Sequence, residues 1–399
     1  NSSQECLVVP AHCLLPDTII HAKDTLLKNI KDIKVGDLVF THRNRWRRVQ
    51  KILKRPYKGK VYNIKPYYFR EGLITTPEHP FYIIKTKKNC HWSRGICKPT
   101  HKDNPDCKEK YYNFYKPNWI PAWNLERGDV LVFPRFKNAF DNHSSIIIER
   151  LLNNSLLKKD GNWIRPRSSR FNSIKNVIPI TKEFCRLAGY YLAEGYSNGR
   201  DAIGLTFHVN EEEFIDDVIG LVNEVFGFNG KIRIREFAGK GKEIVFYSKT
   251  LQQIFANLFY KNTPLNADSK GLPNWMLGLI EEFQVEILKG WWRGDKGYTS
   301  SRILMNQIKI ILLRLGIIPS IYKESQEAHY KRGNHYFAKR EIKANYDCYA
   351  INRLSFFEDK FNLLELPEFR QFRSKSRIRH GWLDDNYVYL PIRDIEISK

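Results

Sequence analysis

Two short glycine-containing segments constrain the fold of this 399-residue chain more than any other feature. The first, Leu187–Gly195, reads LAGYYLAEG, and the second, Leu288–Gly297, reads LKGWWRGDKG. In the first segment Gly189 and Ala193 are four residues apart, so they share one face of a helix. The second segment repeats this spacing with two glycines. Faces of small residues let helix backbones approach closely, so we expect the two helices to pack against each other.

The same register brings two acidic residues together. Thr181 can cap the first helix, and Gly195 can end it in the left-handed conformation that glycine tolerates. Glu194 aligns with Asp295, so helices lying side by side would place both carboxylates at one end. Adjacent carboxylates in a strongly basic protein favour divalent-metal and phosphodiester chemistry. The alternative is a pair of ordinary amphipathic core helices, which would not need matching acids.

The paired motifs resemble those of the LAGLIDADG homing endonucleases. Pro273-Asn274-Trp275, before the second motif, is similar to the segment that joins the repeats in that family. The resemblance extends over roughly Pro179–Phe361. It implies an α+β endonuclease of two αββαββα-type repeats related by a pseudo-twofold axis, in residues 179–270 and 271–380.

The resemblance also implies an activity, which is metal-dependent double-strand cleavage of DNA at a long, asymmetric target. One chain holds both repeats, so a monomer would suffice. Glu194 and Asp295 would bind Mg²⁺ (or Mn²⁺), and Lys270 would assist at the active site. The alternatives are a splicing element with a decayed endonuclease and a non-cleaving DNA-binding protein on the same fold. The presence of both acids argues against the second alternative.

The charge of the chain fits double-stranded DNA as the partner. The formal net charge is +23, and no apolar run is long enough for a membrane helix. In Lys231–Arg235 basic residues alternate with isoleucines, which is typical of a strand with one face on a core and one on phosphates or base edges. The basic residues expected to contact DNA are Lys231, Arg233 and Arg235 in the first repeat, and Lys339, Arg340 and Lys343 in the second. Lys331 and Arg332 lie in the same hairpin region of the second repeat.

Hydrophobic periodicity predicts the remaining elements of both repeats. In the first repeat they are strands at Ala202–Val209 and Glu243–Tyr247, a helix over Glu211–Phe226, and a further helix capped by Ser248. In the second they are a helix over Ser301–Leu315, strands near Ser320–Lys323 and Tyr346–Ile351, and a helix from about Ser355. Residues 137–178, rich in Asn, Ser, Lys and Arg, are predicted to be a linker that contacts DNA.

The N-terminal part of the chain predicts a compact all-β unit instead. Short strands with alternating patterning are expected at Val49–Leu53 and Gly59–Ile64. A turn at Gly36-Asp37 leads into a strand, and Gly128-Asp129 repeats this arrangement. The chain is therefore expected to be multidomain, with an all-β part and an α+β part.

Two motifs of this part resemble the Hint domain of inteins: Cys13 followed by LLPDT, and the T-x-x-H element from Thr76 to His79. The resemblance implies a splicing domain in residues 13–136, preceded by the end of a host protein (the N-extein) in residues 1–12. A cysteine thiol at a splice junction can attack the preceding carbonyl and exchange the amide for a thioester. Thr76 would form a hydrogen bond nearby, and His79 would polarise or protonate the junction nitrogen.

The C-terminal segment departs from the intein pattern. Inteins end in His-Asn before a nucleophile, and this sequence has no such ending. Residues 381–399 are therefore expected to begin the return into the Hint domain and to be truncated. On this interpretation complete splicing cannot occur within the chain.

A cluster of cysteines and histidines lies in a basic insertion over residues 88–118. Cys90, Cys97, Cys107 and His101 are enough for a tetrahedral zinc site, although their spacing matches no standard zinc finger. Scattered thiols in a basic loop are the alternative. The odd total of seven cysteines, without a signal peptide, predicts an intracellular, cytoplasmic protein.

Overall fold

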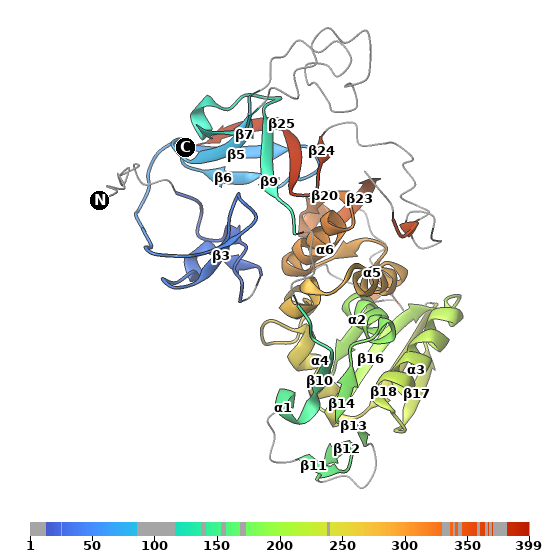
Figure 1. Ribbon diagram of the computed structural model, residues 1–399. Coiled ribbons are helices and arrows are strands. Elements are labelled where there is room, and N and C mark those ends of the chain that lie inside the picture. The colour runs from blue at the N-terminus through green and yellow to red at the C-terminus, as the bar shows by residue number, and fades with distance from the viewer. Residues whose placement is uncertain are drawn as a thin grey trace. The chain divides into compact units, whose positions relative to one another are not determined.

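The computed structural model in Figure 1 divides the chain into two compact units. The first contains Asn1–Lys137, Ser355–Phe357 and Lys375–Lys399, and the second contains Asn138–Leu354 and Glu358–Ser374. Within the described ranges, no helix is long and apolar enough to cross a membrane. The structure describes residues 13–24, 26–85, 116–136, 141–152, 157–167, 173–237, 240–328, 336–337, 340–341, 345–356, 360–363, 366, 369 and 381–398.

The first unit is built on a seven-stranded sheet in the order β6-β5-β25-β9-β7-β8, with β24 beside β25. The last strand, β25, pairs with β5 on one side and β9 on the other, so the C-terminal strand lies among N-terminal ones (Figure 1). Ile392 of this strand packs into a buried cluster with Ile64 and Ile83. The strands are β5 (Val61–Pro66), β6 (Leu73–Thr75), β7 (Pro80–Ile84), β8 (Asn118–Pro121), β9 (Val130–Pro134), β24 (Trp382–Leu383) and β25 (Tyr387–Ser398).

The two Gly-Asp turns of this unit have the same geometry. Gly36 and Gly128 have φ of 99° and 98°, in the left-handed region that favours glycine. The Asp37 carboxylate accepts the Lys34 N–H at 2.9 Å, and the Asp129 carboxylate accepts the corresponding Glu126 N–H at 2.8 Å. Each turn follows a short 3₁₀ helix, η1 (Ile30–Asp32) or η4 (Ala122–Asn124). The internal repetition seen in the sequence is therefore also structural.

Two small hairpins complete the described part of this unit, and one expected strand is wrong. They pair β1 (Ile19–Ile20) with β2 (Lys28–Asn29), and β3 (Leu38–Phe40) with β4 (Trp46–Arg48). The strand expected at Val49–Leu53 does not form, because the hairpin of β3 and β4 ends at Val49. Its carbonyl accepts the Gly36 N–H, and its own N–H binds the Asp37 carbonyl. Residues 51–60 then run without regular structure to β5.

The second unit contains two αβ repeats around a central pair of helices, α2 (Lys182–Glu194) and α5 (Glu281–Asp295). The first repeat has an antiparallel sheet in the order β15-β16-β18-β17, and the second has a sheet in the order β19-β23-β20. The strands are β15 (Gly195–Ser197), β16 (Ala202–His208), β17 (Ile232–Glu236), β18 (Gly241–Tyr247), β19 (Tyr298–Thr299), β20 (Ile317–Glu324), β21 (Tyr336–Phe337), β22 (Arg340–Glu341) and β23 (Cys348–Phe356). The other helices are α3 (Glu212–Phe226), α4 (Lys249–Phe259) and α6 (Arg302–Arg314).

The two predicted helix caps of this unit, Thr181 and Ser248, are confirmed, because the hydroxyl of each accepts the N–H three residues later. Ser301, expected only as the start of a helix, caps α6 in the same way. The helix expected from about Ser355 is wrong, because β23 continues through Phe356. Pairing of this strand with its neighbours in the sheet overrides the local preference of serine for a cap.

The segment expected to be a linker is folded where the structure describes it. Ile146, Ile164, Ile174 and Ile178 in this segment are all buried, so it forms part of the second unit. Its composition was misleading because the isoleucines are spaced among polar residues. Its elements are β10 (Ser145–Ile147), α1 (Ile148–Leu152), β11 (Leu157–Asp160), β12 (Trp163–Pro166), β13 (Ile174–Lys175) and β14 (Val177–Pro179).

Candidate active site at the paired helices

Helices α2 and α5 pack backbone against backbone, and Figure 1 shows them side by side. A Cβ added at Gly189 would lie 2.7 Å from the Trp291 nitrogen and closer still to the Ile287 carbonyl oxygen. A Cβ added at Gly290 would lie 2.8 Å from the Tyr190 nitrogen and closer still to the carbonyl oxygen of α2 one turn earlier. Real Cβ atoms essentially never come within 3.0 Å of such atoms. Only glycine fits at either position.

These contacts are reciprocal, as a local twofold axis requires. Gly189 meets Ile287 and Trp291, while Gly290 meets Arg186 and Tyr190. In the register of the two sequence motifs, which aligns Gly189 with Gly290, Arg186 corresponds to Ile287 and Tyr190 to Trp291. The structure therefore brings the motifs together in the predicted register.

The aromatic pair on each helix anchors it to its own repeat. The Tyr191 ring centroid lies 4.4 Å from that of Phe255 on α4, and the Trp292 centroid lies 4.6 Å from that of Phe369. Both rings are fully buried. A further contact holds α3 against both helices, because the Asp217 carboxylate accepts hydrogen bonds from Tyr190, Arg186 and Arg293.

The two predicted acids end their helices next to each other. Glu194 is the last residue of α2, and Asp295 is the last residue of α5. A Cβ added at Gly294 would lie 2.7 Å from Glu194 Cγ and 3.0 Å from its Oε1. The Glu194 carboxylate thus lies against the last turn of α5, beside the residue that precedes Asp295.

Burial shifts the pKa values of the three ionisable groups at this end of the helix pair toward their neutral forms. Burial raises the pKa of Glu194 to about 7, opposed by the charge of Lys270. Burial and then the charge of Glu194 hold the pKa of Asp295 well above its usual range. Burial lowers the pKa of Lys270 to about 8, against the attraction of both carboxylates. Two carboxylates that are costly to ionise together are the donor set that a divalent cation would stabilise.

Lys270 contacts the end of α2 directly. Its Nζ donates to the carbonyl oxygens of Tyr191 and Leu192 at 3.2 Å and of Ala193 at 3.4 Å. These carbonyls belong to the last turn of the helix, where the Tyr191 carbonyl also accepts the N–H of Gly195 and those of Leu192 and Ala193 have no partner within the helix. Lys270 therefore fixes the turn that carries Glu194, and its charge favours the ionised acids.

The predicted left-handed ending of α2 at Gly195 is wrong. Gly195 has φ of −77° and ψ of 150°, because the chain passes directly into β15. Glycine is needed there for close approach, since a Cβ would lie 2.6 Å from Cγ of Tyr191. The left-handed residue is instead Lys296 at the end of α5, with φ of 50°.

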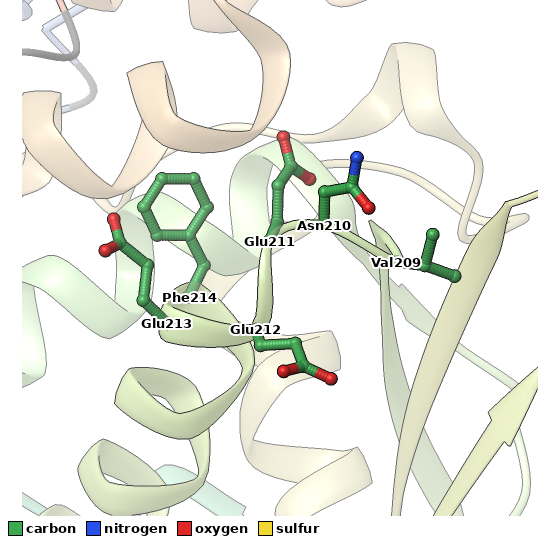
Figure 2. A pocket seen from close by; sticks show the side chains of 6 residues that line it. All are labelled: Val209, Asn210, Glu211, Glu212, Glu213 and Phe214. Atoms are coloured by element: carbon green, nitrogen blue, oxygen red, sulfur yellow. The ribbon is translucent and has the colours of Figure 1, made fainter.

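A third carboxylate near the site was not predicted. Figure 2 shows Glu211 among the six residues Val209–Phe214 at the start of α3. These residues line a polar hollow of about 500 Å³. Its carboxylate accepts the His208 N–H at 2.9 Å and lies 3.8 Å from Lys296 Nζ. Its charge also contributes to the raised pKa of Glu194. Within the described residues, no group of three or more His, Cys, Asp or Glu side chains is placed to hold a metal ion.

The predicted DNA-contacting strand lies at the edge of its sheet. In β17, Arg233 and Arg235 are exposed, as is Lys231 just before the strand. Arg235 forms an ion pair with Glu243 at 2.9 Å. The prediction that the isoleucines of this strand face a core is only partly confirmed, because Ile234 remains 48% exposed on this edge strand. Among the basic residues of the second repeat, Arg340 lies in β22. The others, Lys331, Arg332, Lys339 and Lys343, lie outside the described residues.

The predicted splicing residues of the first unit also come together. The Cys13 N–H donates to Thr76 Oγ1 at 3.2 Å, and the Thr76 N–H donates to the Cys13 carbonyl at 3.1 Å. The His79 N–H donates to the Thr76 carbonyl at 3.1 Å, closing the turn between these two residues. Residues 1–12 and the predicted zinc ligands Cys90, Cys97, His101 and Cys107 lie outside the described residues.

Comparisons with known proteins give relatives of several kinds. The chain is 40% identical over 389 residues to an uncharacterized protein of Methanocaldococcus jannaschii, covering 97% of this chain and 47% of that protein. It is 25% identical to an iron-sulfur cluster assembly SufBD family protein of Mycobacterium tuberculosis, covering 76% and 32%. It is 24% identical to the ATP-dependent DNA helicase Hel308 of Thermococcus kodakarensis, covering 79% and 28%. The chain thus spans less than half the length of each of these relatives.

The structural comparison is weak. Variants of the homing endonuclease I-DmoI align with 47% of this chain and 94% of theirs, at 13% identity and a TM-score of 0.31. I-DmoI has also been solved with DNA and Mn or Ca. A TM-score at this level does not establish a common fold. No protein-family model matches the chain.

Proposed function

We propose that the second unit is a metal-dependent DNA endonuclease of the LAGLIDADG homing type, acting as a monomer on double-stranded DNA. The observation that carries this proposal is the reciprocal packing of Gly189 and Gly290, which sets Glu194 and Asp295 at one end of two symmetric helices. The two repeats around this pair suit an asymmetric target, since each repeat can contact a different half-site.

In this proposal Glu194 and Asp295 would hold Mg²⁺ or Mn²⁺. A divalent cation bound there would activate water and stabilise the leaving oxygen. Burial keeps the site poorly solvated, so each carboxylate gains more from a cation than it would in water. Lys270 holds the end of α2 in place through three carbonyl oxygens, which keeps Glu194 oriented.

In this proposal the basic residues of β17 would contact DNA, together with those expected in the second repeat. The net charge of +23 supports a polyanion partner. Each neutralised phosphate contributes a slope of about −0.9 to log K against log salt. Binding should therefore weaken steeply with salt.

The test is cleavage of a pool of random-sequence DNA with Mg²⁺, followed by sequencing of the cut ends. The proposal expects a single long, non-palindromic sequence to be enriched. Specific binding without cutting would favour a decayed endonuclease or a non-cleaving DNA-binding protein. Absence of any specific binding would overturn the proposal.

We also propose that the first unit is a Hint-type splicing domain, so that the chain from Cys13 onward is part of an intein. The mutual hydrogen bonds of Cys13 and Thr76 support this, as does β25, which returns from the end of the chain into the N-terminal sheet. The relatives support it in another way. An iron-sulfur assembly protein and a DNA helicase share this segment over less than a third of their lengths, as an insertion carried by unrelated hosts would.

The test of this second proposal is thiol-induced cleavage between His12 and Cys13. Dithiothreitol should release the peptide of residues 1–12, detected by mass spectrometry, and Cys13→Ala should abolish the release. Equal release from Cys13→Ala would contradict the proposed role of this cysteine.

A further inference from the structure

A guanidinium group that was not predicted from the sequence lies against the sulfur of Cys13. Arg55 Nε donates to Cys13 Sγ at 3.2 Å. Its Nη2 donates to Glu78 Oε1 at 2.8 Å, and its Cζ lies 5.4 Å from the ring centroid of Tyr57. These contacts fix a side chain that comes from the irregular segment between β4 and β5. The contact with Cys13, followed by that with Glu78, raises the pKa of Arg55.

Two different side chains contact the backbone and the sulfur of Cys13. Thr76 binds the backbone N–H of Cys13, and Arg55 binds its sulfur. Glu78 lies in the same turn as Thr76, two residues further on, so one turn holds the backbone of Cys13 and also anchors the arginine. The charged group in contact with this sulfur is Arg55, Glu78 is paired with that arginine, and the titratable His79 follows Glu78 in the same turn.

We propose that Arg55 is a positioning residue for Cys13, which holds its sulfur in place and favours the thiolate form. The proposal rests on the splicing function proposed above. A charged N–H donor stabilises a thiolate more than a thiol, so it raises the fraction of sulfur that can react at neutral pH. Glu78 keeps the guanidinium in place and limits its net positive charge at the site.

The chemical step is an isomerisation and needs no co-reactant. The Cys13 sulfur forms a bond to the carbonyl carbon of His12, and the bond from that carbon to the Cys13 nitrogen breaks. The proton lost from the thiol is balanced by the proton gained by the nitrogen, which becomes an amine. The thiolate charge disappears once the sulfur is acylated, so Arg55 acts on the nucleophile before attack.

This role predicts a dependence on pH that a merely structural role would not show. Around pH 7 an ordinary cysteine is only a few per cent thiolate, so loss of Arg55 should slow the reaction. Well above the ordinary thiol pKa of about 8.5 the sulfur ionises without help, and the difference should vanish. A folding defect would slow the reaction at every pH.

The experiment uses the full chain with residues 1–12 and compares wild type with Arg55→Gln, Arg55→Lys and the control Arg48→Gln. Arg48 is an exposed residue of β4. Release of the N-terminal peptide by dithiothreitol is followed at about pH 7 and about pH 9.5. Arg55→Gln should be slower by about fivefold to tenfold at the lower pH, consistent with loss of one charge-assisted hydrogen bond. It should match wild type at the higher pH, with Arg55→Lys between the two and the control unchanged.

Alkylation of Cys13 by iodoacetamide, read by peptide mass, tests the same idea without the cleavage step. Slower alkylation of Arg55→Gln at about pH 7 only, with wild type releasing no peptide, would support the role of Arg55 and refute splicing chemistry. Equal alkylation of wild type and Arg55→Gln at both pH values would overturn the role of Arg55, whatever the peptide release shows.

Discussion

Replacing Gly189 by alanine should damage both the stability and the activity of the second unit. The added methyl group would lie 2.7 Å from the Trp291 nitrogen, 3.0 Å from Gly290 Cα and nearer still to the Ile287 carbonyl oxygen. All three atoms belong to the backbone of α5, so no side-chain rotation can relieve the contact. The two helices must move apart at the point where they are closest.

The size of the effect follows from two opposing terms. Reaching ordinary van der Waals contact requires the helices to separate by about 1 Å, and such overpacking costs about 1–3 kcal/mol. Alanine recovers about 0.5–1 kcal/mol through its better helix propensity. The free energy of unfolding should therefore fall by about 1 kcal/mol and by at most about 2.5 kcal/mol, which is a few degrees in Tm for a domain of this size.

The rate of DNA cleavage should fall by more than the loss of folded protein alone would cause. Separating the helices moves Glu194 relative to Asp295, and a displacement of about 1 Å near reacting groups costs about 100-fold in rate. The assay is thermal unfolding together with Mg²⁺-dependent cleavage of DNA, both measured on the same preparation. Gly290→Ala should behave alike because its contacts are reciprocal.

The matched control is Gly220→Ala in α3. Gly220 is exposed, and a Cβ added there would have no atom within 4 Å. This variant should gain about 0.5–1 kcal/mol in stability with unchanged cleavage. If Gly189→Ala were as stable as Gly220→Ala and cut DNA normally, the close packing of α2 and α5 would be refuted.

Three further predictions concern pH, salt and zinc. The raised pKa of Glu194 means that the folded metal-free protein loses stability as pH rises from about 4.5 to about 7. At about 1.4 kcal/mol per pKa unit, Glu194→Gln should raise the free energy of unfolding at pH 8 by about 1–3 kcal/mol. This gain should appear as a higher Tm at pH 8 and an unchanged Tm at pH 4.5. Wild-type Tm falling no faster than that of the variant between these pH values would contradict this. Arg233→Gln should reduce the salt slope of DNA binding by about 1, and an unchanged slope would remove this residue from the phosphate contacts. Metal analysis should find about one zinc per chain, lost in Cys97→Ser with Cys107→Ser, and zinc-free native protein would contradict the cluster.

The central helix pair could be predicted because its signal is local and repeated. Small residues at fixed spacing, an aromatic pair and a terminal acid occur twice in one register, and packing of helices depends on that register. Helix caps at Thr181 and Ser248 were predictable for the same reason, since a cap acts within one turn. The two Gly-Asp turns also depend on neighbouring residues alone.

What could not be predicted depends on contacts between distant parts of the chain. Arg55 reaches Cys13 across 42 residues from a segment without regular structure, and no spacing marks it. Glu211 appeared only as a helix start, and its position near Glu194 depends on how α3 packs. The ending of α2 at Gly195 is set by β15, and Ser355 lies in a strand because of pairing within its sheet. In each case tertiary structure overrides a local preference.

The measurement that tests the central claim most directly is strand-resolved cleavage by Glu194→Gln and Asp295→Asn. The substrate is the sequence that wild type selects from the random pool, with each strand labelled separately and Mg²⁺ present. Each change removes one charge and keeps size and shape, so DNA binding should persist while double-strand cleavage falls by orders of magnitude or stops at a nick. Undiminished cutting of both strands by both variants would show that the active site lies elsewhere.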